Sequence, residues 1–280
     1  MAALPRTIRR LPRSTGRATV LTALLALGLT LSPAAPSSAA SPEAKRPKPT
    51  IVLAHGAFAD ASGWNDVIHT LQKRGYTVYA PANPLRSLSG DTEYLKSFLA
   101  TLSGPVVLVG HSYGGAVITG AATGNPAVKA LVYIAAYAPD QGESVGQATA
   151  LGGGTTELLQ HIVARPFPGA ATGDADASID PAYFRQLFAQ DLPAAQAAQM
   201  AAAQRPAALA TLAQPAGAPG WKTIPSWYLV ARNDHTIPPA AERAMAKRAG
   251  ARTVEINSSH AAMVSHPRAV SDLILNAATN

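Results

Sequence analysis

The sequence predicts an α/β protein whose core is a mostly parallel, doubly wound sheet. Six short apolar runs rich in β-branched residues recur between residues 50 and 256, and stretches of helical length separate most of them. These runs are apolar at successive positions, as are parallel strands that helices cover on both faces. The composition agrees, because 48% of the 280 residues are hydrophobic and 14% are charged, which is too apolar for a disordered chain.

The order of the elements follows from these runs. The expected strands lie at 51–54, 77–80, 106–109, 131–135, 227–230 and 253–256. The expected helices lie at 64–74, 92–102, 115–123, 239–249 and 266–277. Strands that alternate with helices are typical of a sheet with helices on both faces. One domain over residues 50–280 is therefore expected.

The first 40 residues are expected to be a signal peptide. An apolar run over 18–31 follows an arginine-rich start, and it is too short to span a membrane comfortably. Two prolines and the small residues Ser38-Ala39-Ala40 then form a cleavage site. We predict a secreted or periplasmic protein whose mature chain begins near Ser41, with a proline-rich linker over 41–49. An uncleaved N-terminal anchor is the alternative.

The charge of the chain excludes some classes of partner. The formal net charge is +7, and residues 1–40 contribute five arginines and no acidic residue. Residues 41–280 hold 18 Lys and Arg against 16 Asp and Glu, so the body is nearly neutral and gives no reason to expect nucleic-acid binding. The absence of cysteine excludes disulfides, thiolate metal sites and a cysteine nucleophile. We expect no metal, no cofactor and no membrane association after signal cleavage, in a monomer or homodimer.

One long interval interrupts the alternation of strands and helices. Residues 140–222 contain no convincing strand, but they do contain alanine-rich helical pieces around 183–189 and 193–204. About 80 residues are too many for a crossover between neighbouring strands. We expect a small helical cap over about 140–222, placed at the carboxyl ends of the strands, where ligands bind in open sheets.

A candidate nucleophile lies between a strand and a helix. Residues 110–114, Gly-His-Ser-Tyr-Gly, match the pattern G-x-S-x-G, directly after the strand at 106–109 and before the helix at 115–123. This is the setting of a nucleophile elbow, in which the serine occupies a strained turn. Glycine on either side tolerates the close backbone approach. We therefore expect Ser112 to be the nucleophile.

A serine nucleophile needs a base and an orienting acid. Asp234 follows the strand at 227–230, and His260 follows the strand at 253–256. Both residues lie past the carboxyl ends of strands, the edge at which Ser112 emerges, and their order in the chain is the one this type of site uses. Asp140, which follows the strand at 131–135, is the main alternative for the acid.

The loop after the first strand supplies a second part of the site. Its residues 55–58 are His-Gly-Ala-Phe, and we expect the backbone N–H groups of Ala57 and Tyr113 to form an oxyanion hole. Phe58 and Tyr137 are expected either to line the substrate pocket or to pack in the core. Of the two histidines near these loops, His55 is expected to order the loop and His111 to pack against its surroundings.

Five segments resemble the α/β-hydrolases, and within them the group that includes plant methyl-salicylate-type esterases and hydroxynitrile lyases. The resemblance covers about residues 50–277 and implies an α/β-hydrolase fold, with Ser112 as nucleophile, Asp234 as acid and His260 as base. The five segments are VLAHGAF (52–58), GPVVLVGHSYGG (104–115), VKALVYIAAYAPD (128–140), SWYLVARNDHTIP (226–238) and SSHAAMVSHP (258–267).

Two departures from the group favour one activity. Its hydroxynitrile lyases carry a threonine after the first histidine and a lysine after the catalytic histidine, whereas this chain has Gly56 and Ala261 there. The resemblance therefore implies a serine esterase that acts without a cofactor. The expected cap is small and alanine-rich with few charges, which indicates small and mainly apolar carboxylic esters as substrates. The alternatives are acyl transfer, perhydrolysis or C–C hydrolysis on the same fold, and a ligand-binding protein with little turnover.

Overall fold

The computed structural model describes residues 47–280. The predicted signal peptide over 1–40 and the linker up to residue 46 lie outside the described residues. Residues 47–49 lead without regular secondary structure into the first strand, β1 (Thr50–Ala54). In the described part of the chain, no helix combines the length and the apolar character that crossing a bilayer requires.

Six parallel strands form the central sheet, in the order β2-β1-β3-β4-β8-β9. All six expected strands are present, so the predicted fold class is confirmed. The chain runs from β1 outward to β2 and then returns to the other side of β1 to form β3, which places a topological switch between β1 and β3. Ligands bind beside the carboxyl ends of strands at such a switch. The bounds are β2 (Val78–Tyr79), β3 (Val106–Ser112), β4 (Val128–Ala136), β8 (Ser226–Ala231) and β9 (Arg252–Ile256).

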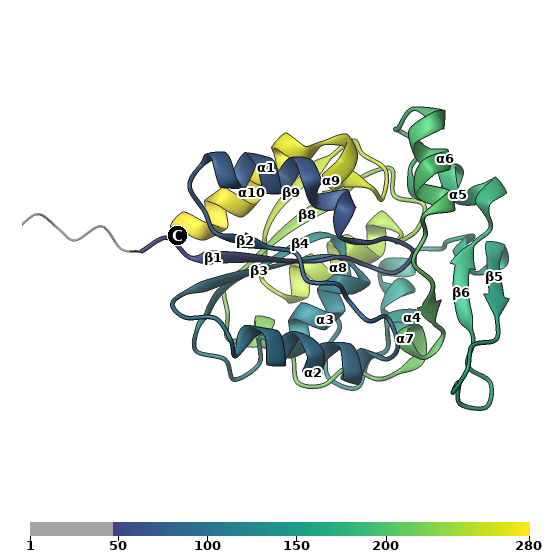
Figure 1. Cartoon of the computed structure of the whole chain (residues 1–280), viewed down its shortest axis with the longest axis horizontal. Helices are drawn as coiled ribbons and strands as arrows, with labels where there is room; N and C mark the ends of the chain where they lie inside the picture. Colours follow the sequence, from purple (N-terminus) through teal and green to yellow (C-terminus); the bar gives the residue numbers. More distant parts are fainter. Residues whose placement is uncertain (1–46) are drawn as a thin grey trace, which may run out of the picture. The chain divides into compact units, whose positions relative to one another are not determined.

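Helices cover both faces of this sheet (Figure 1). On one face α1 (Asn65–Lys73) and α10 (Pro267–Thr279) pack on the side chains of Ile51 and Leu53, and Val52 between them points into the opposite layer. Because successive residues of a strand face opposite sides, a strand covered on both faces is apolar throughout. The other layer holds α2 (Leu88–Leu99), α3 (Tyr113–Ala121) and α8 (Pro239–Arg248). Short helices η1 (Ala61–Trp64) and α9 (Ala262–Ser265) adjoin α1 and α10.

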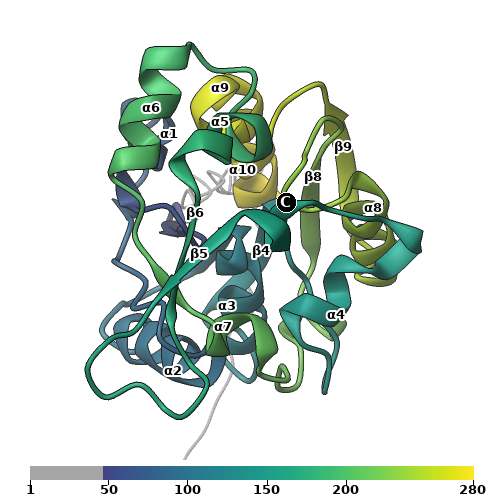
Figure 2. The same ribbon diagram turned by 90° about the vertical axis from the view of Figure 1, so that its right-hand side faces the viewer.

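The insertion between β4 and β8 forms the cap, which lies at one end of the sheet in Figure 1 and faces the reader in Figure 2. It contains helices, as expected, but also an antiparallel sheet in the order β5-β6-β7, so the expectation of no strand here was wrong. Its strands are β5 (Ile162–Arg165), β6 (Asp176–Ile179) and β7 (Ala207–Ala208). Its helices are α4 (Val145–Thr149), η2 (Leu151–Gly153), η3 (Leu158–His161), α5 (Pro181–Phe188), α6 (Ala194–Ala202), α7 (Ala210–Ala213) and η4 (Gly220–Lys222).

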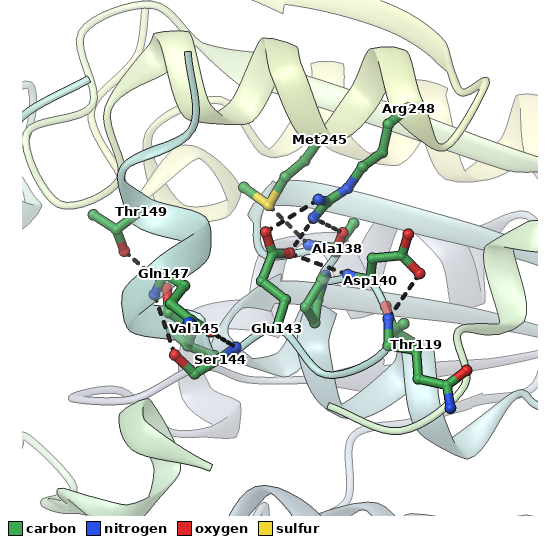
Figure 3. Close-up of polar contacts among 12 residues, drawn as sticks. Thr119, Ala138, Asp140, Glu143, Ser144, Val145, Gln147, Thr149, Met245 and Arg248 are labelled. Atoms are coloured by element: carbon green, nitrogen blue, oxygen red, sulfur yellow. Dashed lines mark hydrogen bonds and ion pairs between the residues drawn. The ribbon is translucent and has the colours of Figure 1, made fainter. Parts of the chain in front are cut away.

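An ion pair fastens the start of the cap to α8 (Figure 3). Arg248, in the last turn of α8, donates to both carboxylate oxygens of Glu143 and to the carbonyl oxygen of Ala138, the last at 2.9 Å. Directly after Glu143, Ser144 and Gln147 form a capping box that begins α4. The residue just before the N-cap of α4 is therefore bonded to the body of the protein.

Candidate active site

The turn between β3 and α3 holds Ser112 in a strained conformation. Its backbone has φ 53° and ψ −127°, a region that residues other than glycine rarely adopt. The turn packs so tightly on the end of β1 that a Cβ on Gly114 would overlap the carbonyl oxygen of Ala54. The sequence allows this turn because Gly114 lies where the turn meets the backbone of β1. Ser112 itself lies at the carboxyl end of β3.

His260 and Asp234 come together from the loops after β9 and β8. The imidazole Nδ1 of His260 lies 2.5 Å from Oδ2 of Asp234, and both side chains are fully buried. A carboxylate only accepts hydrogen bonds, so Nδ1 carries a proton, and in the neutral ring the lone pair is then at Nε2. Nε2 is buried and has no hydrogen-bond partner within residues 47–280. This is the protonation state that a general base at Nε2 requires.

Backbone donors hold the carboxylate of Asp234. Its Oδ1 accepts hydrogen bonds from the N–H groups of Thr236 at 2.6 Å and Ile237 at 2.8 Å. The alternative acid, Asp140, lies near the surface and pairs with Lys222 at 2.6 Å, with 40% of its side chain exposed. Asp234 is therefore the one of the two that contacts His260.

His111 does more than pack, which the sequence had not indicated. Its Nε2 donates to the carbonyl oxygen of His260 at 2.9 Å, and the two ring centroids lie 4.6 Å apart. Burial lowers the pKa of His111 well below the ordinary value, so the ring is neutral. On the other side, the ring of Phe188 from α5 lies 4.7 Å from that of His260, and the Phe188 carbonyl accepts the N–H of Ala261. The elbow and the cap together fix His260.

His55 orders the loop that faces Ser112. Its Nε2 accepts the N–H of Asn83 at 2.9 Å, so its Nδ1 carries the proton and donates to the carbonyl of Gly56 at 3.0 Å. Burial lowers the pKa of His55, in agreement with a neutral ring. A Cβ on Gly56 would lie 2.6 Å from Cβ of Ser112 and 3.1 Å from its Oγ. The loop therefore runs directly against the candidate nucleophile.

The two expected oxyanion donors have free N–H groups. The N–H of Ala57 meets no acceptor among the described residues. Tyr113 begins α3, and the first N–H groups of a helix have no acceptor within it. The side chain of Tyr113 points elsewhere, because its hydroxyl donates to Asp91 at 2.8 Å. Only the backbone of Tyr113 is thus available to a substrate.

The two expected pocket residues have different surroundings. Phe58, which has a φ of 61°, lines a cleft of about 440 Å³ together with Met200 of α6, Met263 and Val264. Ser112 and His260 do not line this cleft. Tyr137 is buried in the core and pairs through its hydroxyl with Thr149 of α4 at 2.9 Å. Across residues 47–280, no three His, Asp or Glu side chains gather as metal ligands would.

Comparisons with known proteins agree with this geometry. Residues 51–273 match the model of the alpha/beta hydrolase family, and the chain belongs to that family. A carbendazim hydrolyzing esterase of Nocardioides sp. (strain SG-4G) is 36% identical over 107 residues, which are 34% of this chain and 44% of that protein. This chain thus spans under half the length of that relative in the match.

Solved structures extend the similarity to most of the chain. A pyrethroid hydrolase from Sphingobium faniae JZ-2 is 25% identical over 82% of this chain and 97% of its own, with a TM-score of 0.67. A methylesterase from Arabidopsis, 18% identical, shares the fold over 82% of this chain and 99% of its own, also with a TM-score of 0.67. The predicted resemblance to the α/β-hydrolases is confirmed.

Proposed function

We propose that this α/β-hydrolase is a secreted serine esterase that cleaves small, mainly apolar carboxylic esters. The observation that carries the proposal is the arrangement at one edge of the sheet. Ser112 occupies a strained turn, and the Nε2 of the buried His260, whose Nδ1 bonds to Asp234, has no hydrogen-bond partner among residues 47–280. The esterase and hydrolase named above support ester hydrolysis as the reaction.

The proposed reaction has two halves. In the first, Nε2 of His260 takes the proton of Ser112 while Oγ attacks the ester carbonyl, and Asp234 stabilises the imidazolium that forms. The N–H groups of Ala57 and Tyr113 bind the oxyanion, and His260 then gives its proton to the leaving alkoxide. In the second half, water attacks the acyl-enzyme with His260 again as base. This releases the acid and restores Ser112.

The surroundings of the site support a small substrate of low charge. The cap is rich in alanine, and its helix α6 reads AAQAAQMAA, without an ionisable residue. The relatives are named for hydrolysing carbendazim and pyrethroids, which supports a small-molecule substrate here.

Export is part of the proposal. The arginine-rich start, the apolar run and the small residues before Ser41 support cleavage near Ala40. N-terminal sequencing of protein recovered outside the cytoplasm should begin near Ser41, and an intact Met1 would refute the cleavage.

The test is the hydrolysis of p-nitrophenyl esters from acetate to decanoate by the mature chain. Ser112→Ala should lower kcat/KM by at least about 10³-fold, because it removes the nucleophile while leaving the oxyanion donors. Ser97→Ala, which removes an exposed hydroxyl on α2, is the matched control and should leave kcat/KM unchanged. Wild-type activity in Ser112→Ala would overturn the mechanism.

A further inference from the structure

One carboxyl group buried near the site has no part in the reaction described above. Glu242 lies in the first turn of α8, with none of its surface exposed. Its Oε2 accepts the N–H of Ala231, at the end of β8, at 3.0 Å. Its Oε1 is buried and has no donor among the described residues. A buried carboxylate with a single donor is costly, so Glu242 must be paired with a cation or carry a proton.

Within the described part of the chain, no cation bonds to Glu242. Arg243, the neighbouring residue of α8, is exposed and bonds instead to Glu255 at 2.8 and 2.9 Å. Tyr228 of β8 and Tyr137 after β4 also lie near Glu242, but their hydroxyls bond to the Ala136 carbonyl and to Thr149. The remaining neighbour is Asp234, whose backbone N–H bonds to the carbonyl of Ala231 while Glu242 accepts the N–H of the same residue. A side-chain hydrogen bond between the two carboxyl groups is among the causes that raise the pKa of Glu242.

Two carboxyl groups in contact share at least one proton, since both cannot ionise together at low cost. Asp234 accepts three N–H groups, from Thr236, Ile237 and His260, whereas Glu242 accepts one. The negative charge is therefore better stabilised on Asp234, and the proton resides on Glu242. Burial first, and then the charge of Asp234, raise the pKa of Glu242 well above its ordinary value, which agrees with this assignment.

We propose that Glu242 is a positioning residue for the catalytic acid: as a neutral carboxylic acid it donates a hydrogen bond from Oε1 to Asp234. The inference rests on the proposed function. Glu242 also holds the loop that carries Asp234, because Ala231 donates its N–H to Glu242 and accepts the N–H of Asp234 at 3.1 Å. Glu242 thus sets both the place of the Asp234 carboxylate and the strength with which it attracts the proton of His260.

The first experiment compares pH profiles of kcat/KM for p-nitrophenyl acetate. Glu242→Gln keeps a neutral donor and an acceptor, so its kcat should stay within about two-fold of wild type. Glu242→Leu removes the donor and should lower kcat about ten-fold, the loss expected for one charge-assisted hydrogen bond. With that donor gone, Asp234 stabilises the imidazolium more strongly, so the acid limb of kcat/KM moves to higher pH. A merely structural role would not shift this limb.

The matched control is Glu255→Gln, which makes the same change at an exposed ion pair on β9 and should leave the acid limb in place. Infrared spectroscopy without substrate gives a second readout that does not depend on turnover or on the stability of the leucine variant. A protonated carboxyl group has a carbonyl stretch distinct from that of a carboxylate. Glu242→Gln should lose such a band at neutral pH, whereas Glu255→Gln and Ser112→Ala should keep it.

The outcomes separate this inference from the proposed function. Wild-type activity in Ser112→Ala would overturn the serine mechanism, whatever the Glu242 variants do. If Ser112→Ala is inactive but Glu242→Leu keeps the kcat and acid limb of wild type, the positioning role alone is overturned. An unchanged carbonyl band in Glu242→Gln would show that Glu242 is ionised and would also overturn it.

Discussion

At the scale of single residues, buried hydrogen bonds between side chains and backbone groups support the candidate site. The carbonyl of His260 accepts from His111, the carboxylate of Asp234 accepts two backbone N–H groups, and the carbonyl of Gly56 accepts from His55. Each of these bonds is buried, where an unpaired polar group costs about 1–3 kcal/mol. Buried hydrogen bonds therefore hold the neighbours of the candidate residues as well as Asp234 itself.

His111 gives a prediction at this scale. His111→Phe keeps an aromatic ring but leaves the His260 carbonyl without its donor. The free energy of unfolding should fall by about 1–3 kcal/mol, and kcat should fall about ten-fold as His260 loses its position. Urea unfolding and ester hydrolysis measure the two effects. The exposed His69 provides the control His69→Phe, and a His111 variant that behaves like this control would contradict the prediction.

Sequence patterns indicated the candidate residues of this site, but not the side chains that support them. Ser112, Asp234 and His260 were assigned because each follows a strand, and strand ends can be read locally. The bond between His111 and His260 joins positions 149 residues apart, and that between His55 and Asn83 joins positions 28 apart. No local sequence pattern predicts a hydrogen bond between residues so far apart in the chain. Glu242 was missed for the same reason, since its residue type and helical position are also those of an exposed glutamate.

At the scale of elements, the contact between Arg248 and Glu143 fixes how the cap begins. Arg248→Met should remove the ion pair and leave Glu143, only 16% exposed, without its cation. The free energy of unfolding should fall by about 2 kcal/mol, and limited proteolysis should cut near α4 first. Lys247→Met, one residue away and exposed, should change stability by less than about 0.5 kcal/mol. Equal stability of the two variants would refute the anchor.

Elements with a continuous apolar pattern were predictable, and short ones were not. The apolar run over residues 106–109 predicted β3, because every side chain of that strand is buried. In the cap, β5 and β6 have four residues each, and none of the side chains of β5 is fully buried. Such strands pair through backbone hydrogen bonds, and their side chains do not form a clear pattern of apolar residues in the sequence. The start of α2 was expected at residue 92 but lies at Leu88, because Ser87 caps it before the apolar pattern begins.

At the scale of the whole molecule, the fold buries both histidines and carboxylic acids. Burial lowers the pKa values of His55 and His111 and raises those of Asp91 and Glu242. His55, His111 and Glu242 are neutral in the folded protein at moderate pH, and each would ionise in the unfolded chain on one side of its ordinary pKa. The same packing that keeps the histidines neutral beside the active site therefore makes stability depend on pH in two opposite directions.

The difference in the free energy of unfolding between Glu242→Gln and wild type isolates the contribution of Glu242, which destabilises the folded protein as pH rises. Below the ordinary glutamate pKa of about 4.3, Glu242 is protonated in both states and affects stability little through its charge. As pH rises, the unfolded chain loses this proton while the folded protein keeps it, so the wild type loses up to about 1.4 kcal/mol per pH unit until the folded group ionises. Glutamine does not titrate, so urea unfolding at successive pH values should show wild type falling away from Glu242→Gln above pH about 5. Parallel curves would mean that Glu242 is ionised in the folded protein, which its single donor and its contact with Asp234 oppose.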